Sequence, residues 1–112
     1  MRNAERTARR RVERFTNALA AVMATEAGRI VLGELVRRAG VYQSTFNTHG
    51  GVQSFNIGRQ DYGHELMADL IRTSEDDWQR LEREQWLWSK AQEREVAAQH
   101  TARASDTAGE DA

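Results

Sequence analysis

Apolar residues recur at the spacing of one helical face in four successive segments of the chain. This pattern predicts four helices at about residues 4–24, 25–39, 53–72 and 74–99, and no sheet is expected. The chain contains no proline, which favours long uninterrupted helices. The sequence therefore predicts an all-α fold, a small bundle of about four helices with long N-terminal and C-terminal helices.

The first helical segment carries its apolar residues on a single stripe that begins only partway along the segment. The members of this stripe are Val12, Phe15, Leu19, Val22 and Met23. The turns before Val12 have no apolar face and therefore no core of their own. We expect these first turns to be ordered by a partner.

Capping residues mark the ends of the second segment. Thr25 is a predicted N-cap, and Glu26 places a negative charge in the first turn of the helix. Gly40 is expected to end the helix, as the glycine that commonly follows a C-cap. The expected buried face consists of Val31, Leu32, Leu35 and Val36.

A loop is expected between the second and third helices, over about residues 41–53. Within it, Gly50-Gly51 reads as a turn or hinge. Tyr42 and Phe46 are the large side chains of this stretch, and we expect them to fill the core from the loop.

The third and fourth segments have their own cap signals. Ser54 is expected to cap the third helix, and Thr73 or Ser74 the fourth. The third helix should carry Phe55, Tyr62, Leu66 and Leu70 along one face. The fourth should present one stripe formed by Trp78, Leu81, Gln85, Trp88, Gln92 and Val96. Trp86 and Leu87 lie off that stripe and are candidate partner contacts.

The chain is long enough for one small domain, which we place at residues 1–100. Residues 101–112 are small, polar and acidic. Such a composition is typical of a tail that is disordered or is ordered only by a partner.

Charge is distributed unevenly along the chain. Residues 1–60 carry 10 arginines and 4 acids, a net charge of +6, whereas residues 61–112 carry 6 basic residues and 13 acids, a net charge of −7. This asymmetry indicates either an electrostatic partner for each end or head-to-tail packing between copies. Two solvated helices that differ in charge would give the same pattern.

No motif of enzyme chemistry is found. The chain has no cysteine, and His49, His64 and His100 do not have the spacing of metal ligands. The sequence contains no nucleophile elbow, no phosphate-binding loop and no apolar run of the length of a membrane span. We therefore expect a protein that is not an enzyme and binds no cofactor or metal.

Two Gly-Arg pairs lie near the start of two helical patterns. Gly28, Gly58 and Gly63 are expected where helices approach closely, because glycine in a helix interior is otherwise unfavourable. Arg29 and Arg59 are expected to bond to nearby acids or to cap carbonyls. The candidate acids are Glu26, Glu34, Asp61 and Glu65.

The start of the first helix is rich in arginine. The residues are Arg2, Arg6, Arg9, Arg10, Arg11 and Arg14. As a helix, this segment places most of them opposite the apolar stripe, so packing of the core does not use them. Arginine makes bidentate contacts with phosphate and with carboxylate, so packed DNA and an acidic protein surface both remain candidate partners. The acidic segment 75–84 of a neighbouring copy is one such surface.

One stretch resembles a helix-turn-helix. Residues 35–51, LVRRAGVYQSTFNTHGG, are similar to the DNA-binding segment of TetR-type repressors. However, the stretch from Val41 to Gly58 holds no Lys or Arg, and a recognition helix normally needs cations. A small DNA-binding regulator is therefore the alternative function.

A second resemblance covers about residues 20–72. The pattern is similar to that of small virion proteins of tailed phages, of the type known from Bordetella podophages. Its first block matches Thr25, Glu26, Gly28, Arg29, Val31, Leu32, Leu35, Gly40, Val41, Ser44 and Phe46. Its second block matches Phe55, Gly58, Arg59, Gly63, Leu66 and Leu70. Thr45 and Gln60 replace a serine and an arginine of the family pattern.

This resemblance implies a structural or ejected protein at the portal–tail vertex of the virion, present in multiple copies. The implied partners are the portal or a tail adaptor or nozzle protein, other copies of the chain and, without sequence preference, packaged DNA. The implied location is the virion, with the host cytoplasm during assembly. The resemblance brings no active site with it.

Overall fold

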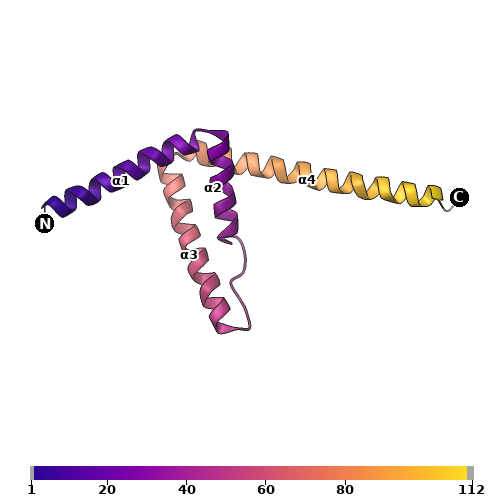
Figure 1. The fold of residues 1–112 in the computed structure, drawn as a ribbon, viewed down its shortest axis with the longest axis horizontal. Helices are drawn as coiled ribbons and strands as arrows, with labels where there is room; N and C mark the ends of the chain where they lie inside the picture. The colour runs from indigo at the N-terminus through magenta and orange to yellow at the C-terminus, as the bar shows by residue number, and fades with distance from the viewer. Residues whose placement is uncertain (1, 111–112) are drawn as a thin grey trace. The chain divides into compact units, whose positions relative to one another are not determined.

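The computed structural model describes residues 2–110, and this range holds four helices and no strand (Figure 1). The helices are α1 (Arg2–Met23), α2 (Glu26–Arg38), α3 (Gly50–Thr73) and α4 (Glu75–Glu110). The all-α prediction is confirmed. The chain divides into two units, one ending at Leu81 and one beginning at Glu82, which are described separately below.

The ends of α2 are set by the predicted caps. The Thr25 hydroxyl accepts a hydrogen bond from the Gly28 amide at 3.0 Å, which satisfies one of the free amides of the first turn. At the other end, Gly40 has φ +70°, and its amide donates to the Arg37 carbonyl at 3.0 Å. Glycine adopts this left-handed conformation without a steric cost, so Gly40 ends the helix.

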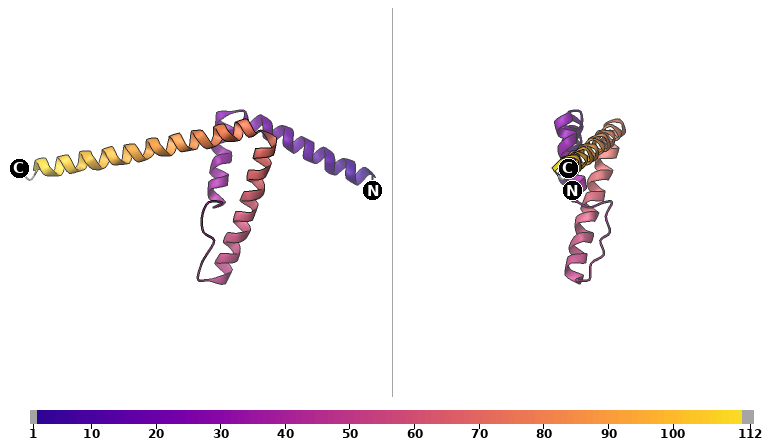
Figure 2. Two further views of the ribbon diagram at one scale, coloured as in Figure 1. Left: turned by 180° about the vertical axis from the view of Figure 1, so that it is seen from behind. Right: turned by 90° about the vertical axis from the view of Figure 1, so that its right-hand side faces the viewer.

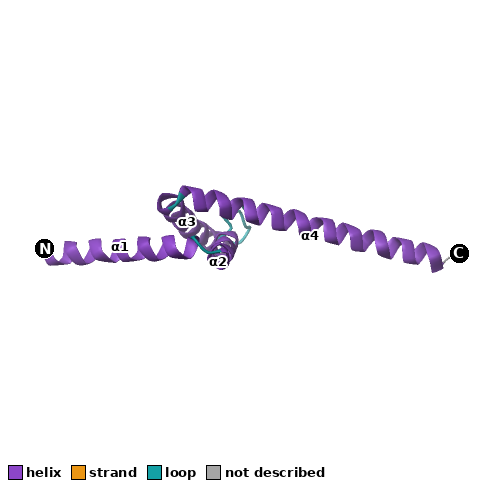
Figure 3. Cartoon of the chain, turned by 90° about the horizontal axis from the view of Figure 1, so that it is seen from above, coloured by secondary structure: helices purple, strands orange, loops and turns teal. Residues whose placement is uncertain are grey.

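Helices α2 and α3 form an antiparallel pair. They run side by side in opposite directions in both views (Figures 1 and 2), and the loop that joins them is the long loop seen from above in Figure 3. Gly63 of α3 packs against the C-cap of α2 and the start of the loop: a Cβ at this position would overlap the Ala39 side chain and lie 2.8 Å from Val41 Cγ1. The missing side chain therefore permits the close contact.

The core of the first unit is small and draws on all four helices and the start of the loop. Its buried apolar residues are Leu19, Met23, Leu32, Val36, Ala39, Val41, Leu70, Trp78 and Leu81. Met23, Leu70 and Leu81 are the largest side chains with almost no exposed surface. Helix α1 contributes only its last turns, because every residue from Arg2 to Ala18 is exposed.

The start of α3 differs from the prediction. The helix begins at Gly50, with His49 as an N-cap that makes no side-chain capping bond, so Ser54 lies inside the helix. Gly50 and Gly51 are helical and do not form a hinge. The turn lies just before them, where the Asn47 side chain accepts a hydrogen bond from the His49 amide at 2.9 Å. This local bond directs the chain into the helix without a capping serine.

Several apolar side chains that were expected in the core are exposed. Tyr42 and Phe46 keep 76% and 74% of their surface in solvent, so the prediction that they fill the core is wrong. Val31 and Leu35 of the predicted buried face of α2 are exposed as well, and so are Phe55 and Tyr62 on the predicted face of α3 and Trp88 and Val96 on the predicted stripe of α4. Helical periodicity identified the helices correctly, but too few elements are packed here to cover every apolar face that it marks.

Helix α4 begins as predicted and extends further than predicted. The Ser74 hydroxyl accepts a hydrogen bond from the Asp77 amide at 3.3 Å, and three acids, Glu75, Asp76 and Asp77, lie in the first turn. The helix continues to Glu110, so residues 101–110 are helical where a tail was expected. Between residues 82 and 107 no side chain is buried.

None of the helices in the described range has the length and apolar character needed to cross a membrane.

Candidate interaction surfaces

The arginines of α1 form an exposed basic surface. Arg2, Arg6, Arg9, Arg10, Arg11 and Arg14 are all exposed. Among residues 2–110 none of them forms an ion pair, because the ion pairs of this range lie in α2, α3 and α4. The charge of this surface is therefore available to a partner. That it contacts a partner remains a prediction.

A groove of about 750 Å³ lies between α1 and the C-terminal end of α3. It is lined by Arg11, Val12, Phe15, Thr16, Asp69, Arg72 and Thr73. Val12 and Phe15 remain 63% and 49% exposed, although both belong to the predicted apolar stripe of α1. Arg72 bonds to Asp69 at 2.5 Å, so Arg11 is the basic residue of the groove that has no ion pair in the described range. The sequence did not reveal this groove, because it depends on how α1 and α3 meet.

The first Gly-Arg pair is part of the joint between α1 and α2. Arg29 is 7% exposed and donates from Nη1 to the Met23 carbonyl at 3.0 Å, so it caps the C-terminus of α1. This is one of the two kinds of partner that were predicted for Arg29. A Cβ at Gly28 would overlap the Val22 carbonyl oxygen and lie 2.7 Å from the Thr25 hydroxyl. Both residues therefore hold the tight turn between the two helices.

The second Gly-Arg pair has different surroundings. No atom lies within 4 Å of a Cβ built at Gly58, so the prediction of a close approach at this glycine is wrong. The Arg59 guanidinium lies over the Phe55 ring, 5.8 Å from its centroid, and makes no ion pair within residues 2–110. The predicted bond from Arg59 to an acid or a carbonyl is therefore not found. Arg59 and Phe55 instead form an exposed cation–aromatic pair on α3.

Gln60 holds the loop against α3. Its side-chain amide donates to the Gly40 carbonyl at 3.0 Å and to the Gln43 carbonyl at 2.9 Å. The Gly40 carbonyl also accepts the Gln43 amide at 3.0 Å. The planar amide with two hydrogens can serve both carbonyls at once. In the sequence, Gln60 stands out only as a departure from a family pattern, and nothing in a single sequence indicates these partners.

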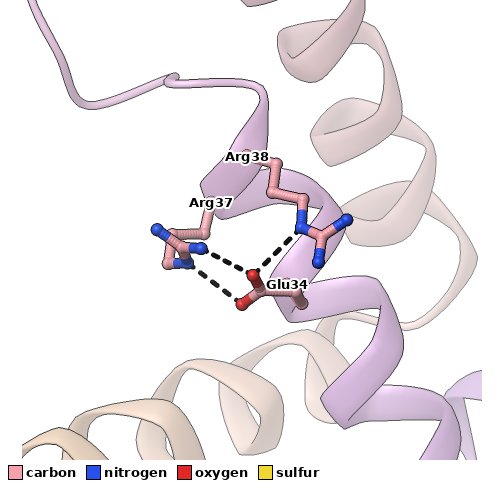
Figure 4. Close-up of polar contacts among 3 residues, drawn as sticks. All are labelled: Glu34, Arg37 and Arg38. Atoms are coloured by element: carbon pink, nitrogen blue, oxygen red, sulfur yellow. Dashed lines mark hydrogen bonds and ion pairs between the residues drawn. The ribbon is translucent and has the colours of Figure 1, made fainter.

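Glu34 binds two arginines on the exposed side of α2 (Figure 4). Its carboxylate accepts two bonds from Arg37, at 2.6 and 3.0 Å, and one from Arg38 Nε at 3.1 Å. The hydrogen bonds from Arg37 and then Arg38 lower the pKa of Glu34 from 4.5 to about 2. Glu34 therefore pairs within its own helix, and not with Arg29 or Arg59, for which it was a candidate partner.

This pKa shift predicts a specific dependence of stability on pH. The folded state holds Glu34 ionised more strongly than the unfolded state does, so its stabilising contribution is complete above about pH 4.5 and is lost as the pH falls towards about 2. We expect Glu34→Gln to lower the denaturation midpoint slightly at neutral pH, and by less as the pH falls through this window. Urea denaturation across pH checks this.

Glu5→Gln, which removes an exposed acid of α1 that forms no ion pair within residues 2–110, is the matched control and should change the denaturation midpoint at neutral pH less than Glu34→Gln does. The effect of Glu34→Gln should also shrink at high salt, because these groups are exposed and screened. A difference between wild type and Glu34→Gln that is constant from neutral pH to about pH 2 would contradict the assignment.

In the second unit, Trp86 and Leu87 are 59% and 48% exposed. The Lys90 ammonium lies 5.8 Å from the centroid of the Trp86 ring and bonds to Glu93 at 3.2 Å. Both apolar residues are therefore accessible, as a partner contact requires. Their role as partner contacts remains a prediction.

The described residues contain no group of three or more His, Asp or Glu side chains that could hold a metal ion.

The contacts together define a small all-α protein with an antiparallel helical pair, a tight α1–α2 joint and exposed basic and aromatic surfaces. The chain belongs to the family of Bbp19-like phage proteins, whose model matches residues 19–83. No curated protein and no solved structure was found to match the chain. The predicted membership of a phage protein family is confirmed.

Proposed function

We propose that this phage protein is a structural component of the virion of a short-tailed phage, bound in multiple copies at the portal–tail vertex. Its proposed partners are a portal or tail adaptor or nozzle protein, further copies of the chain and, through the α1 arginines, packaged DNA without sequence preference. The proposed location is the virion, with the host cytoplasm during assembly. The proposal assigns the protein no catalytic step and no cofactor.

The observation that carries this proposal is the balance of buried and exposed apolar residues. Among the described residues, nine apolar side chains are buried, whereas seventeen large ones are exposed, and these occur on all four helices and in the loop. Monomeric proteins rarely leave extended apolar surface in water, and such surface marks contact with other proteins. A subunit that is completed by its neighbours in an assembly accounts for this surface.

The regulator alternative has less support. In a helix-turn-helix the two helices cross at about 90–120° through a turn of a few residues. Here α2 and α3 run antiparallel, and a loop of eleven residues, 39–49, joins them (Figure 1). The segment from Val41 to Gly58, which would supply the recognition helix, carries no Lys or Arg. This geometry does not present a cationic helix for insertion into a DNA groove.

The proposal is tested on purified virions. We expect mass spectrometry to detect the protein in particles that have been separated from free protein by density gradient. Particles made without the gene should lack it and should show a defect in tail attachment or DNA delivery. Absence of the protein from infectious particles, combined with sequence-specific binding to duplex DNA, would instead support a regulator.

A further inference from the structure

We propose that the groove between α1 and α3 binds the first turns of the second unit of another copy, so that copies join head to tail. The proposed contact on the second copy is the stripe formed by Glu82, Trp86 and Glu93. This inference deepens the proposed multi-copy assembly and rests on it for its biological setting. The contact itself can be measured on the purified chain alone.

The groove supplies one half of the contact. Phe15 lies half-exposed in it, and Arg11 precedes Phe15 by four residues, so both side chains lie on the same face of α1. Arg11 has no ion pair within residues 2–110. The groove lining thus combines apolar side chains with a cation that has no ion pair within the described residues. A complementary ligand is a helix that carries an aromatic residue beside a carboxylate.

The second unit presents such a helix face. Glu82, Trp86 and Glu93 occur at positions i, i+4 and i+11, which brings them to the same side of α4. Trp86 is 59% exposed and Glu82 is exposed. The contacts of Lys90 with the Trp86 ring and with Glu93 cover only part of this face. Because no side chain from 82 to 107 is buried, the stripe has no covering element in its own unit.

The two surfaces match in charge and in the spacing of their residues. The Arg11 and Phe15 pair and the Glu82 and Trp86 pair have the same four-residue spacing, so a helix in the groove can bring guanidinium to carboxylate and ring to ring. A DNA partner would satisfy the arginine but would leave Phe15 and Trp86 in water. A second copy of the chain accounts for all four residues. Because the two surfaces differ, the contact is head-to-tail and generates rings or filaments.

The test measures self-association of the full chain by sedimentation at increasing concentrations. We expect Phe15→Ser and Trp86→Ser each to weaken it about ten-fold or more, because buried aromatic anchors dominate interfaces. The matched controls are Phe46→Ser in the loop and Trp88→Ser on another face of α4, which remove rings that are more exposed than Phe15 and Trp86. Both controls should associate like the wild type, and circular dichroism should show unchanged helix content in all four variants.

A charge exchange tests the geometry directly. Arg11→Glu and Glu82→Arg should each weaken association, whereas an equal mixture of the two variants should regain it, because each then meets an opposite charge. A chain that stays monomeric at all concentrations would overturn the inference. If that chain is nevertheless found in virions, the proposed function is still supported. Unchanged association of Phe15→Ser, with salt-sensitive binding of the α1 arginines to an arbitrary DNA duplex, would overturn it in favour of a nucleic-acid contact.

Discussion

Gly28→Ala is expected to destabilise the protein by about 3 kcal/mol, which is at the upper end of the usual cost of overpacking. The added Cβ would overlap the Val22 carbonyl oxygen, which is backbone and cannot rotate away. That carbonyl also accepts hydrogen bonds from the Thr25 amide at 3.2 Å and from the Thr25 hydroxyl at 2.9 Å. Relief of the overlap would therefore disrupt the capping of α2 and the position of the Arg29 side chain. Urea denaturation measures the loss.

Gly58→Ala is the matched control, because Gly58 also lies in a helix and directly precedes an arginine. Its Cβ would meet no atom within 4 Å, so alanine should stabilise α3 by about 0.5–1 kcal/mol through its better helix propensity. The two substitutions are chemically identical and should change stability in opposite directions. Equal effects of the same sign would show that the α1–α2 joint does not have the packing described here.

Leu70→Ala is expected to cost about 3–5 kcal/mol, the range of a large aliphatic residue whose cavity cannot collapse. Leu70 has 0% of its surface exposed and lies in a core of only nine apolar residues. A domain of this size has a total stability of about 5–10 kcal/mol, so the variant should lose roughly a third or more of it. Thermal and urea denaturation at one fixed protein concentration check this, since association shifts apparent stability.

Leu87→Ala removes the same atoms from a residue that is 48% exposed and serves as the control. Its effect on stability should stay within about 0.5 kcal/mol. Similar losses for Leu70→Ala and Leu87→Ala would mean that the core of the first unit is not centred where the structure places it.

Much of the fold was predictable, because local chemistry determines it. Helical periodicity indicated all four helices, and the side chains of Thr25 and Ser74 mark two helix starts through bonds to amides a few residues away. Gly40 marks the end of α2 because only a residue tolerant of positive φ fits there. These signals involve residues close in sequence, so a single sequence contains them.

The errors arose where a distant segment decides the outcome. The two Gly-Arg pairs look alike in sequence, but only Gly28 faces the end of another helix. Tyr42 and Phe46 are large apolar residues of the kind found in cores, but the first unit leaves about three quarters of each side chain exposed. The same reasoning applies to the candidate surfaces. The exposed arginines of α1 and the exposed Trp86 were predictable from spacing, whereas the groove between α1 and α3 and the Gln60 bonds were not.

The lack of any buried side chain between residues 82 and 107 has a consequence for folding kinetics. An isolated helix without a packed face is held mainly by its own backbone bonds and exchanges with the coil in about a microsecond or less. We therefore expect the second unit not to share the cooperative unfolding of the core that ends near Leu81. Its residence time in the helical state is set by whatever it binds. The length of this segment can consequently change during evolution without a penalty to the folding of the core.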